Sequence, residues 1–288
     1  MPLLLPCLDS DDRAAHCCAV LSIDRDRALL LGRSAVAAAD QGRYRTSNGK
    51  SVDWSAAVEH ARAAKVSIPP DAPLPTCAEV AGRDTRVQVA NETTLDAARR
   101  LADRGLRVLA LNFANGIQPG GGFLSGALAQ EEVLCRSSAL FMTLDGDPMY
   151  EAHARRPLPD ATDWAILSPE VPVFRTDDGT AVDAPWTLSI LTCAAPYAPG
   201  VGLERAGDLL AARIRRVLAI AVAYGYDGLV LGAWGCGAFH NDPARTARDF
   251  HEALAEHDGA FTEVVFAIAD WSPERRFLGP FRNVLSAD

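Results

Sequence analysis

The chain has 288 residues, of which 49% are hydrophobic and 23% charged, and its formal net charge is −9. This composition excludes disordered, collagen-like and coiled-coil proteins, and it supplies enough apolar side chains for one large or two small domains. The acidic balance argues against proteins that coat duplex nucleic acid by neutralising its phosphates. Apart from Lys50 and Lys65, the basic side chains are arginines. A polyanionic ligand would therefore have to be held by something other than bulk positive charge.

The seven cysteines are scattered along the chain and include no CxxC pair. This pattern favours reduced thiols over a disulfide framework or a zinc site. No segment approaches the ~20 apolar residues of a membrane span. The apolar start is short, interrupted by proline and followed by Asp9, Asp11 and Asp12, which is unlike a signal peptide. We therefore expect a cytoplasmic protein without a metal ion or membrane contact, and we take a monomer as the default state.

Residues 1–75 predict a mostly helical extension. Residues 26–40 are rich in alanine and leucine and predict a helix that ends before Gly42. Residues 43–54 predict a short extended segment around a turn, after which Asp53 is placed to cap a helix that ends near residue 65. Four prolines between residues 69 and 75 mark a boundary. We expect residues 1–24 to be flexible and residues 76–288 to form the main domain.

From residue 86 onward, predicted strands and helices alternate. The strands are predicted at residues 86–90, 108–113, 164–167, 187–193, 228–231 and 263–269, and the helices at residues 95–104, 204–224 and 243–257. Thr93 and Asp96 form a variant capping box at the start of the first of these helices. Pro169 and Pro172 are expected to end the third strand. Such alternation predicts a three-layer α/β/α fold with a largely parallel central sheet.

Two glycine-rich loops follow the predicted strands 108–113 and 228–231. The first contains three consecutive glycines at 120–122, and the second contains Gly235 and Gly237. Ligands of open α/β sheets bind at the carboxyl ends of the strands, and glycine lets the backbone approach a phosphate closely. Neither loop matches a P-loop or a dinucleotide-binding GxGxxG motif. Two such loops on one sheet favour a site that holds a diphosphate from both sides.

Gln130, Glu131 and Glu132 begin after a spacer of seven residues from Gly122. Adjacent glutamates on a helix usually form a solvated face, but after a glycine loop one of them can reach a bound ligand. Neighbouring helical side chains diverge by about 100°, so the two carboxylates cannot flank one glycosidic bond as in ordinary glycosidases. In a hydrolase, one of the two would be the general acid and base and the other a positioning group.

The arrangement of three glycines, seven residues and Gln-Glu-Glu resembles the signature of poly(ADP-ribose) glycohydrolases, which have a macrodomain fold. Residues 232–243 resemble the diphosphate-binding loop of the bacterial-type members, and residues 112–115 resemble the ribose-facing asparagine segment of macrodomains. Residues 42–44 and 91–94 are similar to the amino-terminal part of the same family. The resemblance covers residues 25–275 and implies a macrodomain-like domain with no cofactor.

The resemblance also implies the catalytic roles. Glu132 would protonate the departing ribose 2′-oxygen and then activate water, while Glu131 would hold ribose hydroxyls. Gln130 would fix the loop, and Asn115 would bind the terminal ribose.

The remaining implied substrate contacts are distributed over three segments. The glycines would line the ribose-diphosphate cleft, amides of the second loop would bind the diphosphate, an aromatic ring would orient the terminal ribose, and one carboxylate would lie near the adenine. The glycines are Gly120, Gly121 and Gly122, and the amides are those of Gly235, Cys236, Gly237 and Ala238. The aromatic ring is that of Phe239, and the carboxylate near the adenine is that of Glu92.

Two further patterns have competing interpretations. Cys236 and His240 suggest a thiol nucleophile with a base, but a cysteine between glycines favours close packing of small residues. Trp186, Tyr197 and Trp234 could stack on an adenine ring, but aromatic residues of such a fold more often belong to the core.

Three functions remain open at this point. The favoured one is release of ADP-ribose from the ends of poly(ADP-ribose), through an oxocarbenium-like transition state and with one glutamate as acid and base. The second is hydrolysis of mono-ADP-ribosylated proteins or of O-acetyl-ADP-ribose. The third is a module that binds ADP-ribose without cleaving it, although the intact pair of glutamates argues against this. The family resemblance implies ADP-ribosylated proteins as substrates and a part in reversing ADP-ribosylation after DNA damage.

Overall fold

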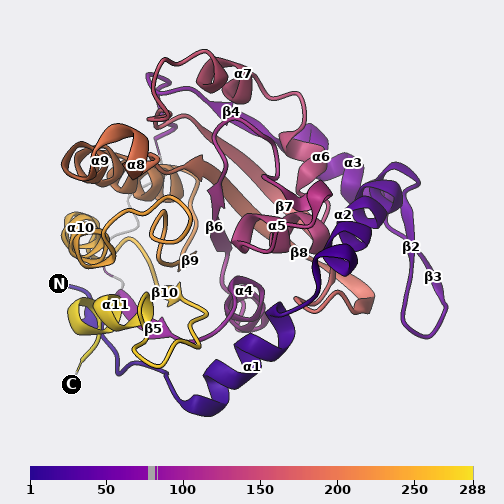
Figure 1. Ribbon diagram of the computed structural model, residues 1–288, viewed down its shortest axis with the longest axis horizontal. Helices are drawn as coiled ribbons and strands as arrows, with labels where there is room; N and C mark the ends of the chain where they lie inside the picture. The colour runs from indigo at the N-terminus through magenta and orange to yellow at the C-terminus, as the bar shows by residue number, and fades with distance from the viewer. Residues whose placement is uncertain (77–81, 83, 288) are drawn as a thin grey trace.

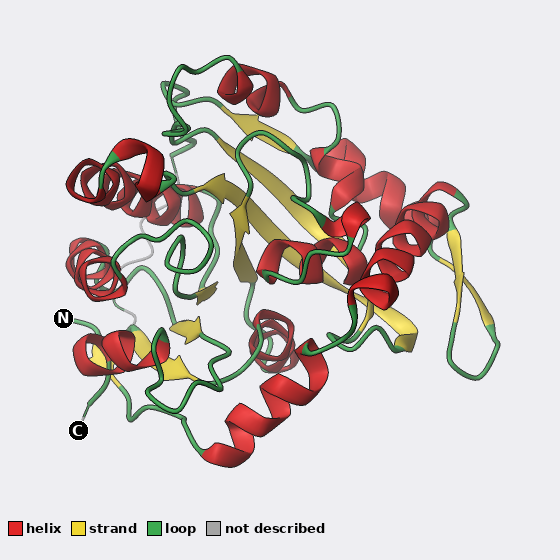
Figure 2. Ribbon diagram, in the orientation of Figure 1, coloured by secondary structure: helices red, strands yellow, loops and turns green. Residues whose placement is uncertain are grey.

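The computed structural model describes residues 1–76, 82 and 84–287, and its central feature is a mixed sheet of eight strands (Figures 1 and 2). In spatial order these are β1 (Leu3–Leu4), β5 (Arg86–Ala90), β10 (Glu263–Ala267), β9 (Gly228–Leu231), β6 (Val108–Ala114), β8 (Ala181–Ala194), β7 (Ala165–Arg175) and β4 (Val66–Ile68). Neighbouring strands are parallel from β1 to β8 and antiparallel from β8 to β4. The predicted α/β fold with a largely parallel sheet is confirmed.

Helices cover both faces of this sheet because its central strands are apolar on both sides. In β10, Val264 and Phe266 pack into one hydrophobic cluster and Val265 into the other, as the alternation of a strand requires. The first cluster includes α9 (Leu203–Ala223), α10 (Pro243–Glu256) and α11 (Leu278–Leu285). The second includes α2 (Arg25–Asp40), α3 (Ser55–Ala64), α4 (Thr94–Asp103), α5 (Gln130–Ser137), α6 (Phe141–Leu144) and α7 (Pro148–Ala154).

The helices predicted at residues 26–40, 95–104, 204–224 and 243–257 correspond to α2, α4, α9 and α10, with ends displaced by one residue at most. The predicted cap of α4 is present, because the backbone N–H of Asp96 donates to Oγ1 of Thr93 over 3.1 Å. The prediction that Pro169 and Pro172 end the third strand is wrong. Strand β7 continues past both prolines through a shift of register between Ser168 and Val171, where neither proline interrupts the pairing of the strand as a whole.

The first 24 residues contain ordered elements that their sequence did not predict. Strand β1 extends the central sheet beside β5, and helix α1 (Asp11–Leu21) follows, capped by the hydroxyl of Ser10. Strand β4 also lies in the central sheet, whereas β2 (Arg43–Arg45) and β3 (Ser51–Asp53) form a separate hairpin that projects from the molecule (Figure 1). A domain boundary near residue 75 stays a prediction, but strands from both sides of it share one sheet.

Two further findings concern the described residues only. None of their helices is long and apolar enough to cross a membrane. Their six cysteines are free thiols, and Cys77 lies outside the described part of the chain.

Candidate active site

A cleft of about 470 Å³ opens at the carboxyl ends of the parallel strands. It brings together, from segments far apart in the sequence, most of the residues predicted to form the site. The predicted residues in its wall are Glu92, Asn115, Gln130, Glu131, Glu132, Gly235, Gly237, Ala238 and Phe239. Gly120, Gly121, Gly122 and Cys236 were also predicted to contact the ligand, but they do not belong to this wall.

The glycines of the first loop lie against the two glutamates. Gly120 and Gly121 have left-handed backbones, with φ values of +70° and +58°. A Cβ atom on Gly121 would lie 2.4 Å from Oε1 of Glu132 and 2.9 Å from Oε2 of Glu131. The loop therefore needs glycine at this position both for its backbone conformation and for its approach to the carboxylates.

Glu131 is 3% exposed, and both of its carboxylate oxygens have protein partners. Oε1 accepts a hydrogen bond from Nδ2 of Asn112 at 3.2 Å, and Oε2 accepts one from the backbone N–H of Asn115 at 2.7 Å. Burial raises the pKa of Glu131 to about 8, and the nearby Glu132 adds to this rise, while the hydrogen bonds from Asn115 and Asn112 oppose it. The raised pKa favours the protonated form of Glu131, which contacts the loop that carries Asn115.

Glu132 differs from its neighbour in having one uncommitted oxygen. Oε1 accepts a hydrogen bond of 2.9 Å from the backbone N–H of Gly122. Oε2 is buried and has no hydrogen-bond partner among the described residues, although the side chain belongs to the cleft wall. Buried polar atoms without partners are rare and costly, so an oxygen of this kind in a cleft marks a position where a ligand can bond.

Gln130 connects three elements at the base of the cleft. Its Oε1 accepts from the backbone N–H of Phe113 at 2.9 Å, and its Nε2 donates to the carbonyl of Leu111 at 2.8 Å. Nε2 also donates to Oγ1 of Thr94 at 3.2 Å. These bonds tie the start of α5 to the end of β6 and to α4.

Helix α2 supports the first loop through direct contact between backbones. A Cβ on Gly32 would lie 2.5 Å from the carbonyl oxygen of Phe123, and one on Gly126 would lie 2.3 Å from the carbonyl oxygen of Arg25. Nε of Arg25 also donates to the carbonyl of Ser125 at 3.0 Å. The loop that carries the three glycines is therefore fitted closely to the helix of the N-terminal region.

The second glycine loop presents free backbone donors to the cleft. The N–H groups of Gly235, Gly237 and Ala238 donate to no acceptor within the described chain, whereas that of Cys236 donates to the carbonyl of Ala233 at 3.1 Å. The loop is held by Asn241, whose Nδ2 donates to the carbonyls of Pro196 and Gly235 at 2.9 and 3.1 Å. Three of the four amides predicted to bind a diphosphate are thus available.

The structure does not support a thiol nucleophile in this loop. Cys236 is 4% exposed, and burial raises the pKa of its thiol to about 12. Its sulfur lies 3.6 Å from the carbonyl oxygen of Trp234, and His240 makes no hydrogen bond with it. A thiol in this environment stays protonated, which favours the packing interpretation of this cysteine.

Sequence reasoning missed two aromatic residues of the cleft, Trp271 and Phe277. Trp271, 46% exposed, and Phe277 line the cleft from the loop after β10, and Leu21 lines it from the end of α1. Of the three aromatic residues considered for stacking on adenine, Trp234 belongs to the cleft wall although it is buried, whereas Trp186 and Tyr197 do not line the cleft. Because the loop after β10 leaves the same edge of the sheet as the two glycine loops, its position after a predicted strand was a usable signal.

Asp177 is a further carboxylate in the cleft wall that the sequence did not indicate. Its Oδ2 accepts a hydrogen bond of 2.8 Å from Oγ1 of Thr93, and burial raises its pKa to about 6.

Comparisons with known proteins identify the family. Residues 32–176 match the family model of the microbial-type PARG catalytic domain. The crystal structure of poly(ADP-ribose) glycohydrolase from Thermomonospora curvata is 38% identical, with 90% of this chain and 99% of that chain covered and a TM-score of 0.83. Its complex with the inhibitor ADP-HPD gives a TM-score of 0.81 at the same identity and coverage.

The enzyme from Deinococcus radiodurans in complex with ADP-ribose is 39% identical, with 79% of this chain and 96% of that chain covered and a TM-score of 0.72. No protein with a curated description matches the chain. The matches extend over nearly the whole length of these solved structures. The fold, the cleft and the pair of glutamates agree with the sequence signature. The chain therefore belongs to the microbial-type poly(ADP-ribose) glycohydrolases, hydrolases that act on the glycosidic bonds of poly(ADP-ribose).

Proposed function

We propose that Glu132 is the general acid and base of this hydrolase and that the enzyme releases ADP-ribose from the ends of poly(ADP-ribose). The observation that carries the assignment is the asymmetry of the Glu132 carboxylate. One oxygen is fixed by the N–H of Gly122, and the other is buried in the cleft wall without a partner among the described residues.

Cleavage of a ribose–ribose bond passes through an oxocarbenium-like state, so its main requirement is a proton for the leaving 2′-oxygen. Oε2 of Glu132 would give this proton and then accept one from the water that attacks the anomeric carbon. Glu131, whose raised pKa favours its protonated form, would hold ribose hydroxyls, and Asn115 would contact the terminal ribose.

The second loop would bind the diphosphate through the free amides of Gly235, Gly237 and Ala238. Phe239 would orient the terminal ribose, and its ring packs edge-on against Tyr197 at a centroid distance of 5.9 Å. The adenosine would then occupy the rest of the cleft, near Glu92. A diphosphate beside the anomeric carbon would also stabilise the positive charge that develops there, which reduces the demand on protein carboxylates.

The test is ADP-ribose release from defined poly(ADP-ribose) by the wild type and by Glu132→Gln. We expect the variant to lose at least ~10²-fold in kcat, the usual contribution of a general acid, while it still binds ADP-ribose. Glu59→Gln, at a glutamate with a 74% exposed side chain on α3, is the control and should keep the wild-type rate. A Glu132→Gln enzyme with the wild-type rate would refute the assignment, and early release of long oligomers would refute action at chain ends.

A further inference from the structure

Three segments of the cleft wall each follow a strand, and these three strands are neighbours in the sheet. The first glycine loop follows β6, the second follows β9, and the loop of residues 268–277 follows β10. Since strands are spaced ~4.8 Å apart, the third loop lies about 10 Å along the sheet edge from the first. If ribose lies at the first loop and diphosphate at the second, as proposed above, Trp271 and Phe277 face the adenosine end of the ligand.

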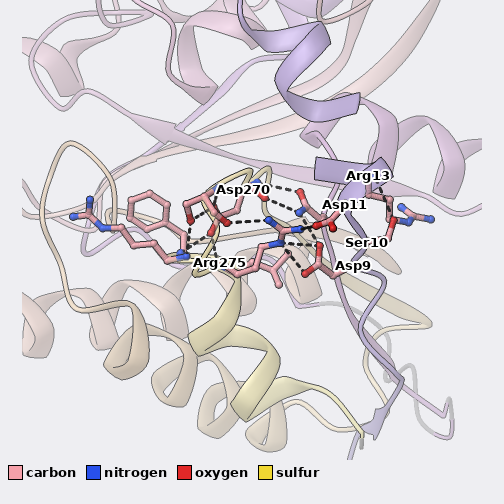
Figure 3. A network of polar contacts seen from close by, with 11 residues as sticks. Asp9, Ser10, Asp11, Arg13, Asp270 and Arg275 are labelled. Atoms are coloured by element: carbon pink, nitrogen blue, oxygen red, sulfur yellow. Dashed lines mark hydrogen bonds and ion pairs between the residues drawn. The ribbon is translucent and has the colours of Figure 1, made fainter. Parts of the chain in front are cut away.

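The loop of residues 268–277 is tied to the N-terminal segment by an ion pair. Nε of Arg275 donates to Oδ1 and Oδ2 of Asp9 at 3.1 and 2.9 Å, and Nη2 donates to Oδ1 of Asp11 at 3.0 Å (Figure 3). The side chains of Arg275 and Asp9 are only 12% and 14% exposed. Nε therefore shares its one proton between the two oxygens of Asp9, and a pair whose two side chains are largely buried fixes geometry in a way that an exposed pair does not.

Asn91 connects the same aspartate to the other end of the loop. Its Nδ2 donates to Oδ1 of Asp9 at 2.9 Å and to the carbonyl of Asp270 at 2.7 Å, and its Oδ1 accepts from the N–H of Asp270 at 3.0 Å. Asn91 immediately precedes Glu92 of the cleft wall. The loop that carries Trp271 is therefore held to the N-terminal segment both at its start and near its end.

The backbone at Arg275 has a conformation that its residue type disfavours. Its φ of +50° lies in the left-handed region, where residues other than glycine, asparagine and aspartate are uncommon. Its side chain also donates to the carbonyl of Ser272 at 2.9 Å, within the same loop. The contacts with Asp9, Asp11 and Ser272 hold the arginine in this conformation and thereby set the course of the chain between Trp271 and Phe277.

We propose that Asp9 and Arg275 are positioning residues for substrate binding. In this view the N-terminal segment of residues 1–24 completes the cleft, through the Asp9–Arg275 pair that holds the aromatic loop and through Leu21, which lines the cleft directly. The inference rests on the proposed orientation of ADP-ribose, and it assigns the first 24 residues to recognition of the adenosine end.

The main test variant is Arg275→Asn, because asparagine tolerates the left-handed backbone but cannot reach the aspartates. We expect it to weaken binding of ADP-ribose and of ADP by the same factor, about 10-fold, and to raise KM for the polymer by that factor with kcat retained. ADP lacks the terminal ribose, so an equal loss for both ligands places the defect in the part of the cleft that holds ADP and excludes the contacts to the terminal ribose. Asp9→Asn should give a similar loss, the double variant should lose no more than either single one, and Arg275→Lys should recover part of the affinity.

The control for stability alone is Lys65→Gln, which breaks the pair between Lys65 and the fully buried Asp147 at 3.0 Å, outside the cleft wall. It should lower Tm without changing KM or either affinity. Unchanged affinities in Arg275→Asn would overturn the proposal, and so would a loss confined to kcat or shared by Lys65→Gln. The polymer assay with Glu132→Gln decides the proposed function separately, since neither ADP binding nor the Arg275 comparison depends on that carboxylate.

Discussion

The backbone N–H of Gly122 donates a 2.9 Å hydrogen bond to Oε1 of Glu132, so the glycine loop and the first turn of α5 hold each other in place. The spacer of seven residues in the signature is the stretch of chain that folds back to make this contact possible. The loop therefore positions the carboxylate that we propose as the general acid and base, although its three glycines are absent from the cleft wall.

Gly121→Ala is expected to abolish most activity. The added methyl group would collide with both carboxylates, at 2.4 Å from Glu132 and 2.9 Å from Glu131, on a backbone with a φ of +58°. We expect a loss of ~1–3 kcal/mol in the free energy of unfolding and at least ~10²-fold in kcat, because misplacing reacting groups by about 1 Å is that costly. Urea denaturation and the polymer assay measure the two effects.

Gly49→Ala is the matched control for this substitution. Gly49 has a φ of +85°, but a Cβ there would have no neighbour within 4 Å. It should show the backbone strain alone, about 1 kcal/mol, with full activity. Equal activities of the two alanine variants would contradict the proposed role of the close contact at Gly121.

The raised pKa of Glu131 predicts that stability falls as the pH rises. Burial, the largest cause, puts this pKa at about 8 instead of 4.5, so between these values the folded state binds more protons than the unfolded state. The contribution of Glu131 to the free energy of unfolding is fully present below about pH 4.5 and is lost as the pH rises through 8. Between these values the free energy of unfolding falls by up to ~1.4 kcal/mol per pH unit. Glu131→Gln, which remains neutral, removes this dependence.

Unfolding of the wild type and of Glu131→Gln should be compared between pH 7 and 9 by urea denaturation. This range lies above the pKa of about 6 of Asp177, so the titration of that residue does not add to the comparison. Glutamine can be accommodated at this position, because Oδ1 of Asn112 is buried without a partner in the described chain and can accept from the new amide. Parallel stability curves for the two proteins would show that Glu131 does not titrate in this range.

Cys236→Ala is expected to keep kcat within about 2-fold of the wild type. The thiol is buried and its pKa is raised to about 12. The hydrogen bond from the backbone N–H of Cys236 to the carbonyl of Ala233 does not involve the side chain and is kept in the variant. The folded wild type should also retain its activity after brief treatment with iodoacetamide, which modifies thiolates. Loss of polymer cleavage in the alanine variant, with ADP-ribose binding intact, would instead support a catalytic thiol.

Binding of ADP-ribose should depend only weakly on salt. The diphosphate is assigned to uncharged amides of the second loop, on a chain with a net charge of −9. The slope of log K against log [salt] should therefore stay below about 1 in magnitude, the value for roughly one neutralised phosphate. Calorimetric titrations over a series of NaCl concentrations measure this slope, and a steep one would point to arginines that contact the phosphates.

The site was more predictable than the path of the chain around it. Glycines before a Gln-Glu-Glu triplet carry a local signal, and continuous apolar strands such as Val108–Ala114 reveal their burial in the sequence itself. Strand β1, in contrast, has two residues, and it exists because β5 offers it an open edge. The continuation of β7 past Pro172 likewise depends on its pairing with the long strand β8, which no local pattern announces.

The same distinction explains which cleft residues were missed. Trp271 and Phe277 have no recognisable motif, and their position depends on Arg275 finding Asp9 across a separation of 266 residues. Such partners are known only once the chain is folded. The family resemblance suggested that Glu92 lies near the adenine, whereas its place in the cleft wall and its ion pair with Arg100 are visible only in three dimensions.

The contact between Gly32 of α2 and the carbonyl oxygen of Phe123 limits how members of this family can be recombined. Backbone meets backbone at this point, and Gly126 makes a second such approach to Arg25. Neither contact can be repaired by choosing another side chain, since there is no room for one on the glycines. A chimaera that takes the glycine loop from a relative should therefore take the matching α2 helix with it, and exchanging either segment alone should yield misaligned glutamates in an otherwise folded protein.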